Sequence, residues 1–308
     1  MKRTRLTLLL TFAATAVLFY SLPATSWVPE TSPSVRLKWP GAVSWVVNPA
    51  HGTNITGAKS VTAVITDAFA QWTGAPNTAI PIGSIGTTTT STTVSSNDGQ
   101  NLICFTCTVS GGFGKDTIAV TLTAFQSSGV MVDADMVFNT ANTFITDPVA
   151  ATGNDESLQT VATHEFGHFL GLDHSAVVRS IMNPFAPPLL LTLSYDDLAG
   201  ISTTYPAPGF TPITISGTVR NGANVPVFGA HVFAESTTNT LSFPAPTPTS
   251  GVRKSPIGTI SNADGTYSIS GVPQDSYTVT AEPLDGPVNN TNFGGSPAFA
   301  TNFTTRQH

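Results

Sequence analysis

Three of the six histidines fall within one eleven-residue stretch, HEFGHFLGLDH, together with a glutamate. Because residues four apart share one face of an α-helix, His164 and His168 would present two imidazoles to a single metal ion. Glu165 lies beside the first of them, where a carboxylate acts as a general base on metal-bound water rather than as a ligand. His174 joins them only if the chain turns back after the helix, and Gly171 permits the positive φ that such a turn requires.

This set of side chains predicts a catalytic zinc site. Three histidines hold a tetrahedral zinc ion and leave its fourth position for water, which is typical of catalytic rather than structural sites. The alternative is three solvated or capping histidines on an ordinary amphipathic helix, which does not explain the spacing of the histidines.

The elements that must position this stretch follow from hydrophobic periodicity. Apolar residues at i, i+3 and i+4 predict helices, whereas β-branched and apolar runs predict strands. In chain order we predict a strand at 43–47, a helix at 60–72, strands at 117–125 and 130–138, a helix at 155–170 and a helix at 194–205. The helix at 155–170 is expected to be capped by Asn154 or Asp155 and carries two of the histidines.

The HEFGHFLGLDH stretch resembles the extended zinc motif of the metzincin metallopeptidases. Met182 matches the methionine that these enzymes place in a tight turn, the Met-turn, beneath the zinc. Ser175 follows the third histidine as in the matrixin branch, which contains the matrix metalloproteinases and bacterial relatives. Residues 193–201 are similar to the matrixin C-terminal helix, in which an acidic residue braces the Met-turn. Asp197 is the candidate for this brace, and capping of the helix start is the alternative.

The resemblance covers 43–205 and implies an α+β fold, with a twisted, mostly parallel sheet, an antiparallel edge strand and three helices. It also implies a zinc-dependent endopeptidase with Glu165 as general base, acting on a protein or peptide laid along the 117–125 edge strand. The rival interpretation is a zinc-bearing but inactive binding protein, and the intact Glu165 argues against it.

The resemblance also bears on further metal ions. Vertebrate matrixins hold a second, structural zinc, but its matching positions here are Thr123 and Asp135, so we expect a single catalytic zinc. Four acids remain as calcium candidates, with turn-forming or capping roles as the alternative. They are Asp133, Asp135, Asp147 and Asp155.

The chain beyond the third predicted helix has a different sequence pattern. Residues 206–212 form a Pro-rich linker, and 213–282 contain short strands separated by turn signals, which predicts a small all-β sandwich. This part resembles the carboxypeptidase regulatory-like domain, a transthyretin-like fold. Residues 283–308 carry little periodicity and are expected to form a tail.

The first residues indicate export. A positive start, an apolar run and small residues at 23–26 predict a signal peptide at 1–26, cut after Ala24 or Ser26, with an uncleaved membrane anchor as the alternative. Residues 27–42 are expected to be an extended segment. We therefore expect a secreted or extracellular protein, or a periplasmic one in a Gram-negative bacterium, without membrane attachment once the signal is removed.

Cysteine usage and charge agree with this compartment. Cys104 and Cys107 are the only cysteines and are expected to form a local disulfide rather than a redox motif or half of a zinc site. Charged residues make up 10% of the chain and the net charge is -6, which argues against nucleic-acid binding. We expect a monomer.

Overall fold

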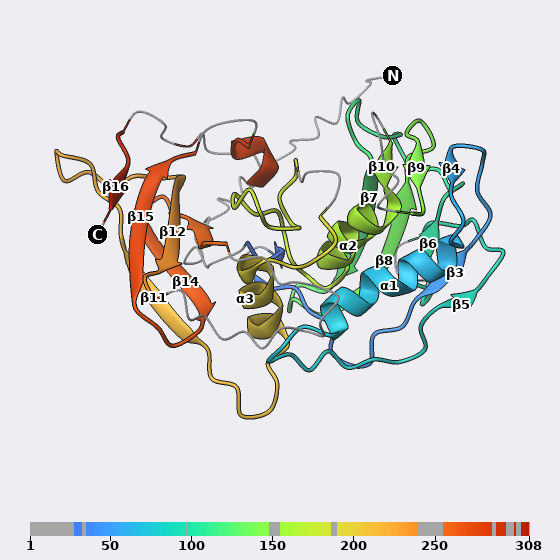
Figure 1. Ribbon diagram of the computed structural model, residues 1–308, viewed down its shortest axis with the longest axis horizontal. Helices are drawn as coiled ribbons and strands as arrows, with labels where there is room; N and C mark the ends of the chain where they lie inside the picture. Colours follow the sequence, from blue (N-terminus) through green and yellow to red (C-terminus); the bar gives the residue numbers. More distant parts are fainter. Residues whose placement is uncertain are drawn as a thin grey trace, which may run out of the picture.

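The computed structural model describes residues 28–32, 35–95, 98–147, 155–185, 190–238, 255–284, 288–293, 299 and 303–307. The expected signal peptide lies outside these residues. Figure 1 shows a unit of sheet and helices beside a unit built of strands, with α3 (Tyr195–Thr204) between them. No helix in the described part of the chain is long and apolar enough to cross a bilayer.

The first unit is built on a five-stranded mixed sheet. Neighbouring strands pair in parallel except at one edge, where β7 runs antiparallel to β8, as the sequence predicts. In spatial order the strands are β5 (Thr87–Thr88), β3 (Val46–Asn48), β6 (Leu102–Cys104), β8 (Met131–Phe138) and β7 (Ala119–Phe125).

Short strands extend this unit. Three of them form a parallel sheet. Two others form an antiparallel pair within the segment expected to be extended at 27–42. These strands are β4 (Ile55–Thr56), β9 (Phe144–Ile145) and β10 (Glu156–Ser157) in the first, and β1 (Thr31–Ser32) and β2 (Val35–Arg36) in the second.

Two helices, α1 (Val61–Thr73) and α2 (Leu158–Phe169), pack against each other beside the sheet. The indole of Trp72, fully buried in α1, donates to the carbonyl oxygen of Thr163 in α2 at 2.8 Å. Phe69 and Phe166 meet at a ring-centroid distance of 4.9 Å. Aromatic packing therefore fixes the position of the helix that carries two of the histidines.

The start of α2 differs from the expectation that Asn154 or Asp155 caps this helix. Ser157 caps the helix, and its hydroxyl accepts from the Thr160 amide at 3.2 Å. Glu156 and Ser157 are extended because they pair with β9, so strand pairing overrides the helical tendency of these residues.

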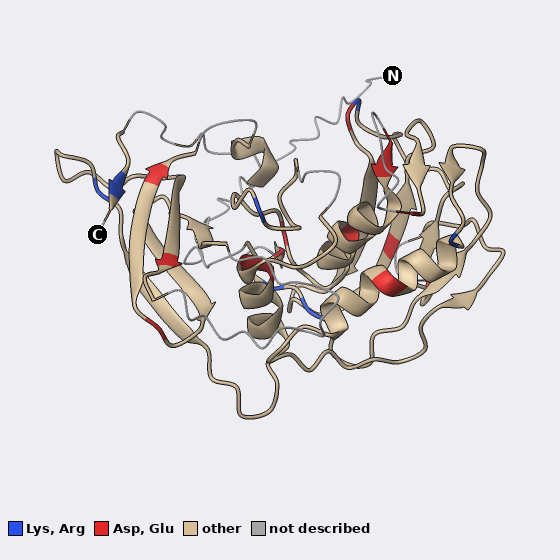
Figure 2. Ribbon diagram, in the orientation of Figure 1, with Lys and Arg blue, Asp and Glu red and all other residues tan. Residues whose placement is uncertain are grey.

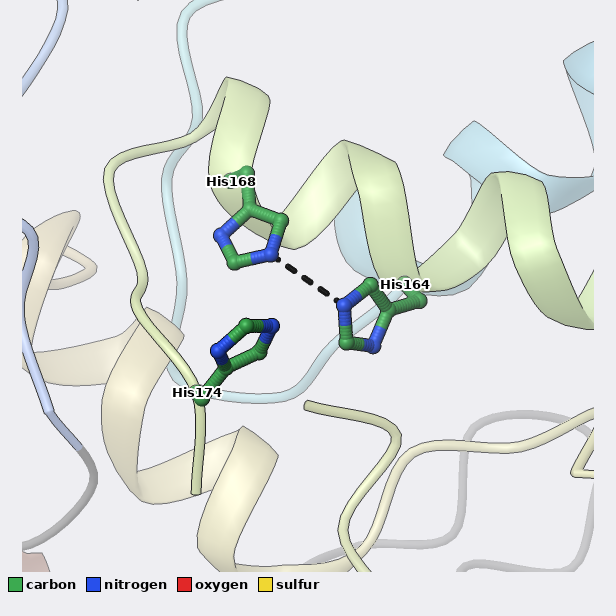
Figure 3. Close-up of side chains that lie close together, drawn as sticks. All are labelled: His164, His168 and His174. Carbon is green, nitrogen blue, oxygen red and sulfur yellow. Dashed lines mark hydrogen bonds between the residues drawn. The ribbon is translucent and has the colours of Figure 1, made fainter. Parts of the chain in front are cut away.

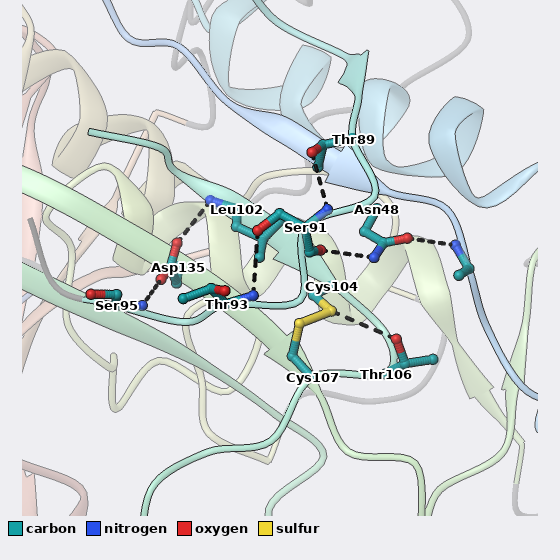
Figure 4. The surroundings of a disulfide bond; sticks show 11 residues. Asn48, Thr89, Ser91, Thr93, Ser95, Leu102, Cys104, Thr106, Cys107 and Asp135 are labelled. Atoms are coloured by element: carbon teal, nitrogen blue, oxygen red, sulfur yellow. Dashed lines mark hydrogen bonds between the residues drawn. A yellow bond between two sulfur atoms is a disulfide. The ribbon is translucent and has the colours of Figure 1, made fainter. Parts of the chain in front are cut away.

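The loop before β6 is tied to the sheet by side chains (Figure 4). Asp135 accepts from the amides of Ser95 (3.0 Å) and Leu102 (2.8 Å). These hydrogen bonds are of the turn-forming kind named above as the alternative to calcium binding. A disulfide joins Cys104 to Cys107 directly after β6.

The second unit contains two antiparallel sheets whose inner faces share a core. One holds β11 (Ile213–Thr218) and β14 (Thr266–Val272). The other holds β13 (Ile257–Ile260), β12 (Ala230–Ser236), β15 (Tyr277–Pro283) and β16 (Arg306–Gln307). The expected tail at 283–308 therefore contributes a strand, because β16 pairs with β15, and also the 3-10 turn η2 (Asn290–Phe293).

The two units share one continuous cluster of buried apolar residues. Contact is closest where α3 meets β14. Gly271 has φ +77°, and a Cβ there would lie 2.4 Å from the carbonyl oxygen of Ala199 and 2.7 Å from the Thr203 hydroxyl. The absence of a side chain at Gly271 thus allows the second unit to lie directly on α3.

This contact predicts different costs for two alanine substitutions. Gly271→Ala and Gly209→Ala both place alanine at positive φ, at about 1–2 kcal/mol. Only Gly271→Ala also collides with α3, because nothing lies within 4 Å of a Cβ at Gly209. We expect urea unfolding to show a further loss of about 1–3 kcal/mol for Gly271→Ala. Equal losses would contradict the close packing of the two units.

Candidate active site

Three imidazoles converge at the C-terminal end of α2 (Figure 3). His164 and His168 project from the same face of the helix, with their Nε2 atoms 3.1 Å apart. His174 comes from the loop beyond the helix, and one nitrogen from each ring lies within 4.8 Å of the others. In the described residues this is the one such group of three or more His, Cys, Asp or Glu side chains.

The opposite nitrogen of each ring meets a backbone carbonyl. A carbonyl oxygen only accepts, so each Nδ1 must carry the proton and each Nε2 must present a lone pair to the centre. The acceptors are Ile181 for His164 (2.7 Å), Leu172 for His168 (2.8 Å) and Asn292 for His174 (3.1 Å). Facing lone pairs repel each other unless a cation lies between them, so this donor set fits a zinc ion.

The surroundings keep the helical histidines neutral. Burial, and then electrostatic repulsion from the neighbouring His174, lowers the pKa of His164 to about 3. Burial, reinforced by His164 and His174, holds the pKa of His168 well below its usual value. Both rings are therefore neutral at neutral pH, with the proton on Nδ1 and Nε2 free, which is the form that binds a metal.

Glu165 is buried beside the histidines and points toward the edge strand. Thr121 of β7 donates its hydroxyl to Glu165 Oε2 at 2.7 Å. Burial raises the pKa of Glu165 to about 7, against the opposing effect of the Thr121 hydrogen bond. A carboxyl group that titrates near neutral pH is suited to accept and return a proton. Thr121 was not singled out from the sequence, although the alternation of β7 places it on the same face as Thr123.

The turn after α2 depends on Gly171, which has φ +87°. A Cβ at this position would lie 2.3 Å from the carbonyl oxygen of Leu37. The N-terminal segment runs alongside, since Glu30 donates its amide to the Gly171 carbonyl (3.0 Å) and Asp173 donates its amide to Val28 (2.7 Å). The turn that brings His174 back is therefore supported from outside.

Met182 lies against the last turn of α2. A Cβ on Gly167 would come within 2.1 Å of the Met182 sulfur, so the methionine fills the space that this glycine leaves. The Met182 carbonyl accepts from the amide of Ser175 at 2.8 Å, which links the turn to the residue after the third histidine.

Asp197 fills both of the roles weighed for it. One oxygen accepts from the Ile181 amide (2.9 Å) and from the Ser194 amide at the start of α3 (2.7 Å). The other accepts from the Ser180 hydroxyl (2.5 Å) and the Met182 amide (3.3 Å). One buried carboxylate thus caps α3 and braces the turn that contains Met182.

Asp196, not singled out as a site residue from the sequence, makes a second link. It accepts from the Ser175 hydroxyl at 2.6 Å and from the Gly258 amide of β13 at 2.8 Å. The loop after His174 is thereby tied to the second unit.

A cleft of about 650 Å³ opens in front of the histidines. Residues 117–121, which lead into β7 and form its first three residues, make up one wall. Lys and Arg occur sparsely along the ribbon (Figure 2), and none of the described residues that line the cleft is Lys or Arg. Its acids are Glu30, Asp116, Glu156, Glu165 and Asp173.

Comparison with known proteins matches this site to one family. The family model described as Matrixin covers residues 38–206, close to the boundaries 43–205 expected from the sequence. Stromelysin-3 from Xenopus laevis is 49% identical over 65 residues, or 21% of this chain and 13% of the relative. Metalloendoproteinase 1 from Glycine max is 39% identical over 75 residues, 24% of each chain. Matrix metalloproteinase-25 from Homo sapiens is 43% identical over 65 residues, 20% of this chain and 12% of the relative. The matches therefore span a quarter or less of these relatives.

The buried pair of aspartates predicts a pH dependence of stability. Burial, and then the neighbouring Asp197, raises the pKa of Asp196 from 3.8 to about 7. An acid with a raised folded-state pKa stabilises the fold below the unfolded value, and this contribution is lost as the pH rises from about 4 through 7. Asp196→Asn removes the ionisation and keeps an acceptor for the Gly258 amide. We expect urea unfolding to find Asp196→Asn more stable than wild type at pH 8, with the gain shrinking toward pH 5. A difference that does not change with pH would contradict this assignment.

Proposed function

The chain belongs to the matrixin family, since the family model covers more than half of its length, and on this premise we propose that it is a zinc-dependent endopeptidase. The observation that carries the proposal is the convergence of three Nε2 lone pairs beside a buried glutamate in an open cleft. The arrangement combines a metal site, a general base and room for a peptide.

In the proposed mechanism, His164, His168 and His174 would hold a zinc ion, which would supply Lewis-acid chemistry to the scissile carbonyl and the attacking water. Glu165 accepts the proton of that water and returns it to the leaving amine. Thr121 holds the Glu165 carboxylate in place through its hydroxyl. The carbonyl of Ile181 keeps Nε2 of His164 free to bind the metal.

A substrate strand is proposed to lie along the free edge of β7. This strand is at the border of the sheet, and residues 117–121 line the cleft, so its unpaired backbone groups are available to a peptide. Above neutral pH the acids of the cleft favour peptides with Lys or Arg side chains over acidic ones, since burial raises the pKa of Glu30 and of Glu165 to about 7.

The other parts of the proposal rest on the sequence. We propose that 1–26 directs secretion, that 43–205 is the peptidase domain, and that 213–282 is a carboxypeptidase regulatory-like sandwich. The Cys104–Cys107 disulfide is consistent with an exported protein. A monomer with one zinc is the proposed working form.

The role of Glu165 is tested by Glu165→Ala. We expect the variant to retain one zinc and to lose at least about 100-fold in kcat/KM on casein, because the proton acceptor is gone while the ligands stay. Glu235→Ala, an exposed position in β12, is the matched control and should behave as wild type. If Glu165→Ala cleaves casein at the wild-type rate, the mechanism is wrong. A wild-type protein that binds zinc but shows no chelator-sensitive cleavage would support the rival binding protein.

The charge of the cleft is tested with paired peptides that differ only by Arg or Glu at one position. We expect the Arg peptide to have the higher kcat/KM, and the ratio to fall as salt is added because screening weakens the attraction. The absence of a preference at every position, or a preference for Glu, would refute the role given to the acids.

A further inference from the structure

Residues 288–293, which lie between β15 and β16 in the chain, return to the metal site. The carbonyl oxygen of Asn292 accepts from Nδ1 of His174 at 3.1 Å, and Asn292 also lines the cleft. In Figure 1, η2 lies over the loop that follows α2. This contact joins positions 118 residues apart and lies beyond the matrixin match at 38–206.

The turn that presents this carbonyl is held by its own side chains. Asn289 accepts through Oδ1 from the Thr291 amide (3.0 Å) and hydroxyl (2.6 Å). Asn292 accepts through its own Oδ1 from the Asn289 amide at 2.9 Å. The direction of the Asn292 carbonyl is therefore set by two asparagine side chains.

The turn is also anchored by a small apolar cluster. Val288 and Ile260 of β13 are buried in it, and Phe293 packs against them. Ala176, two residues after His174, packs against the same cluster. The cluster thus connects the ligand loop, the second unit and the segment that carries Asn292.

Four consecutive residues of the ligand loop depend on the C-terminal region. His174 meets the Asn292 carbonyl, and Ser175 reaches Gly258 through Asp196. Ala176 joins the apolar cluster, and Val177 lies so close that a Cβ on Gly258 would be 2.7 Å from its Cγ2. His164 and His168, by contrast, are fixed by the backbone of α2.

We propose that residues 288–293 are a built-in part of the metal site and that Asn292 is a positioning residue for His174. The inference rests on the proposed function in that His174 is taken as a zinc ligand. The Asn292 carbonyl selects the tautomer that exposes Nε2 and holds the ring at the metal, as hydrogen-bond partners of metal ligands do. The C-terminal region therefore contributes to zinc affinity as well as to any binding role of its own.

The test uses the full chain with the double substitution Asn289→Ala/Asn292→Ala, which removes the side chains that hold the turn. The measured quantity is the zinc dissociation constant, obtained by competition with a chromophoric chelator. We expect binding weaker by roughly 10–100-fold. Asn221→Ala is the matched control, because Asn221 holds a similar turn of the second unit through the amides of Ala223 and Val225, both at 3.0 Å. This control should bind zinc as wild type does.

His174→Ala separates the two levels of the argument. If this variant binds zinc as wild type does, the proposed metal site itself is wrong. If it loses affinity while the double variant does not, the site stands and the inference about Asn292 is overturned. If the double variant shows no cooperative unfolding transition and is therefore not folded, Asn292→Ala is tested alone. This single variant should also bind zinc more weakly than wild type.

A second readout is the tautomer of His174 in the metal-free protein, measured by long-range ¹H–¹⁵N NMR. Wild type and Asn221→Ala should show the Nδ1–H form. The double variant should show a mixture of tautomers at His174, with His164 and His168 unchanged. An unchanged His174 in the double variant would refute the positioning role.

Discussion

Three lone pairs that face one another are the constraint on which the rest of this structure depends. The Nε2 atoms of His164 and His168 lie 3.1 Å apart with no proton between them, because each ring has its proton engaged on the opposite nitrogen. Such an arrangement is unfavourable without a cation and must be imposed by the fold. The three backbone carbonyls that impose it come from three separate segments, namely the turn before Met182, the turn at Gly171 and the C-terminal segment. The metal site therefore depends on backbone groups from segments that are up to 118 residues from the histidines they contact.

Hydrogen bonds that hold the turn at Met182 and the loop after His174 meet at the start of α3. Asp197 holds the turn that contains Met182, whereas Asp196 holds Ser175 and the β13 backbone. Burying two adjacent carboxyl groups is unfavourable, and it is offset only because hydroxyl and amide donors satisfy their oxygens. Asp197 accepts four of the hydrogen bonds described here and Asp196 two, so Asp196 is the member of the pair that more readily takes a proton. The same pair that braces the metal site thus also joins the two units.

Much of this organisation is predictable from local sequence. Helical periodicity predicts α1, α2 and α3, and the spacing of His164, His168 and His174 predicts their convergence, because both depend on residues close in the chain. The contacts that are not predictable join distant positions through backbone atoms. No side-chain pattern marks the carbonyl of Asn292 as the partner of His174, or the two residues of β16 as a strand. Ser157 caps α2 in place of the expected Asn154 or Asp155, because pairing with β9, a tertiary interaction, decides where α2 begins. Thr121 is predictable in part. The alternation along β7 shows which face of the strand it occupies, but not that its hydroxyl contacts Glu165.

The central claim is that three histidines from α2 and the following loop bind one zinc ion and leave a position open. X-ray absorption spectroscopy of the zinc-loaded full chain, combined with its metal content, tests this most directly. The account predicts one zinc per chain, with three imidazole nitrogens and an oxygen at about 2.0–2.1 Å. Fewer than three nitrogens around the metal, sulfur in its coordination shell, or a second tightly bound zinc would contradict it.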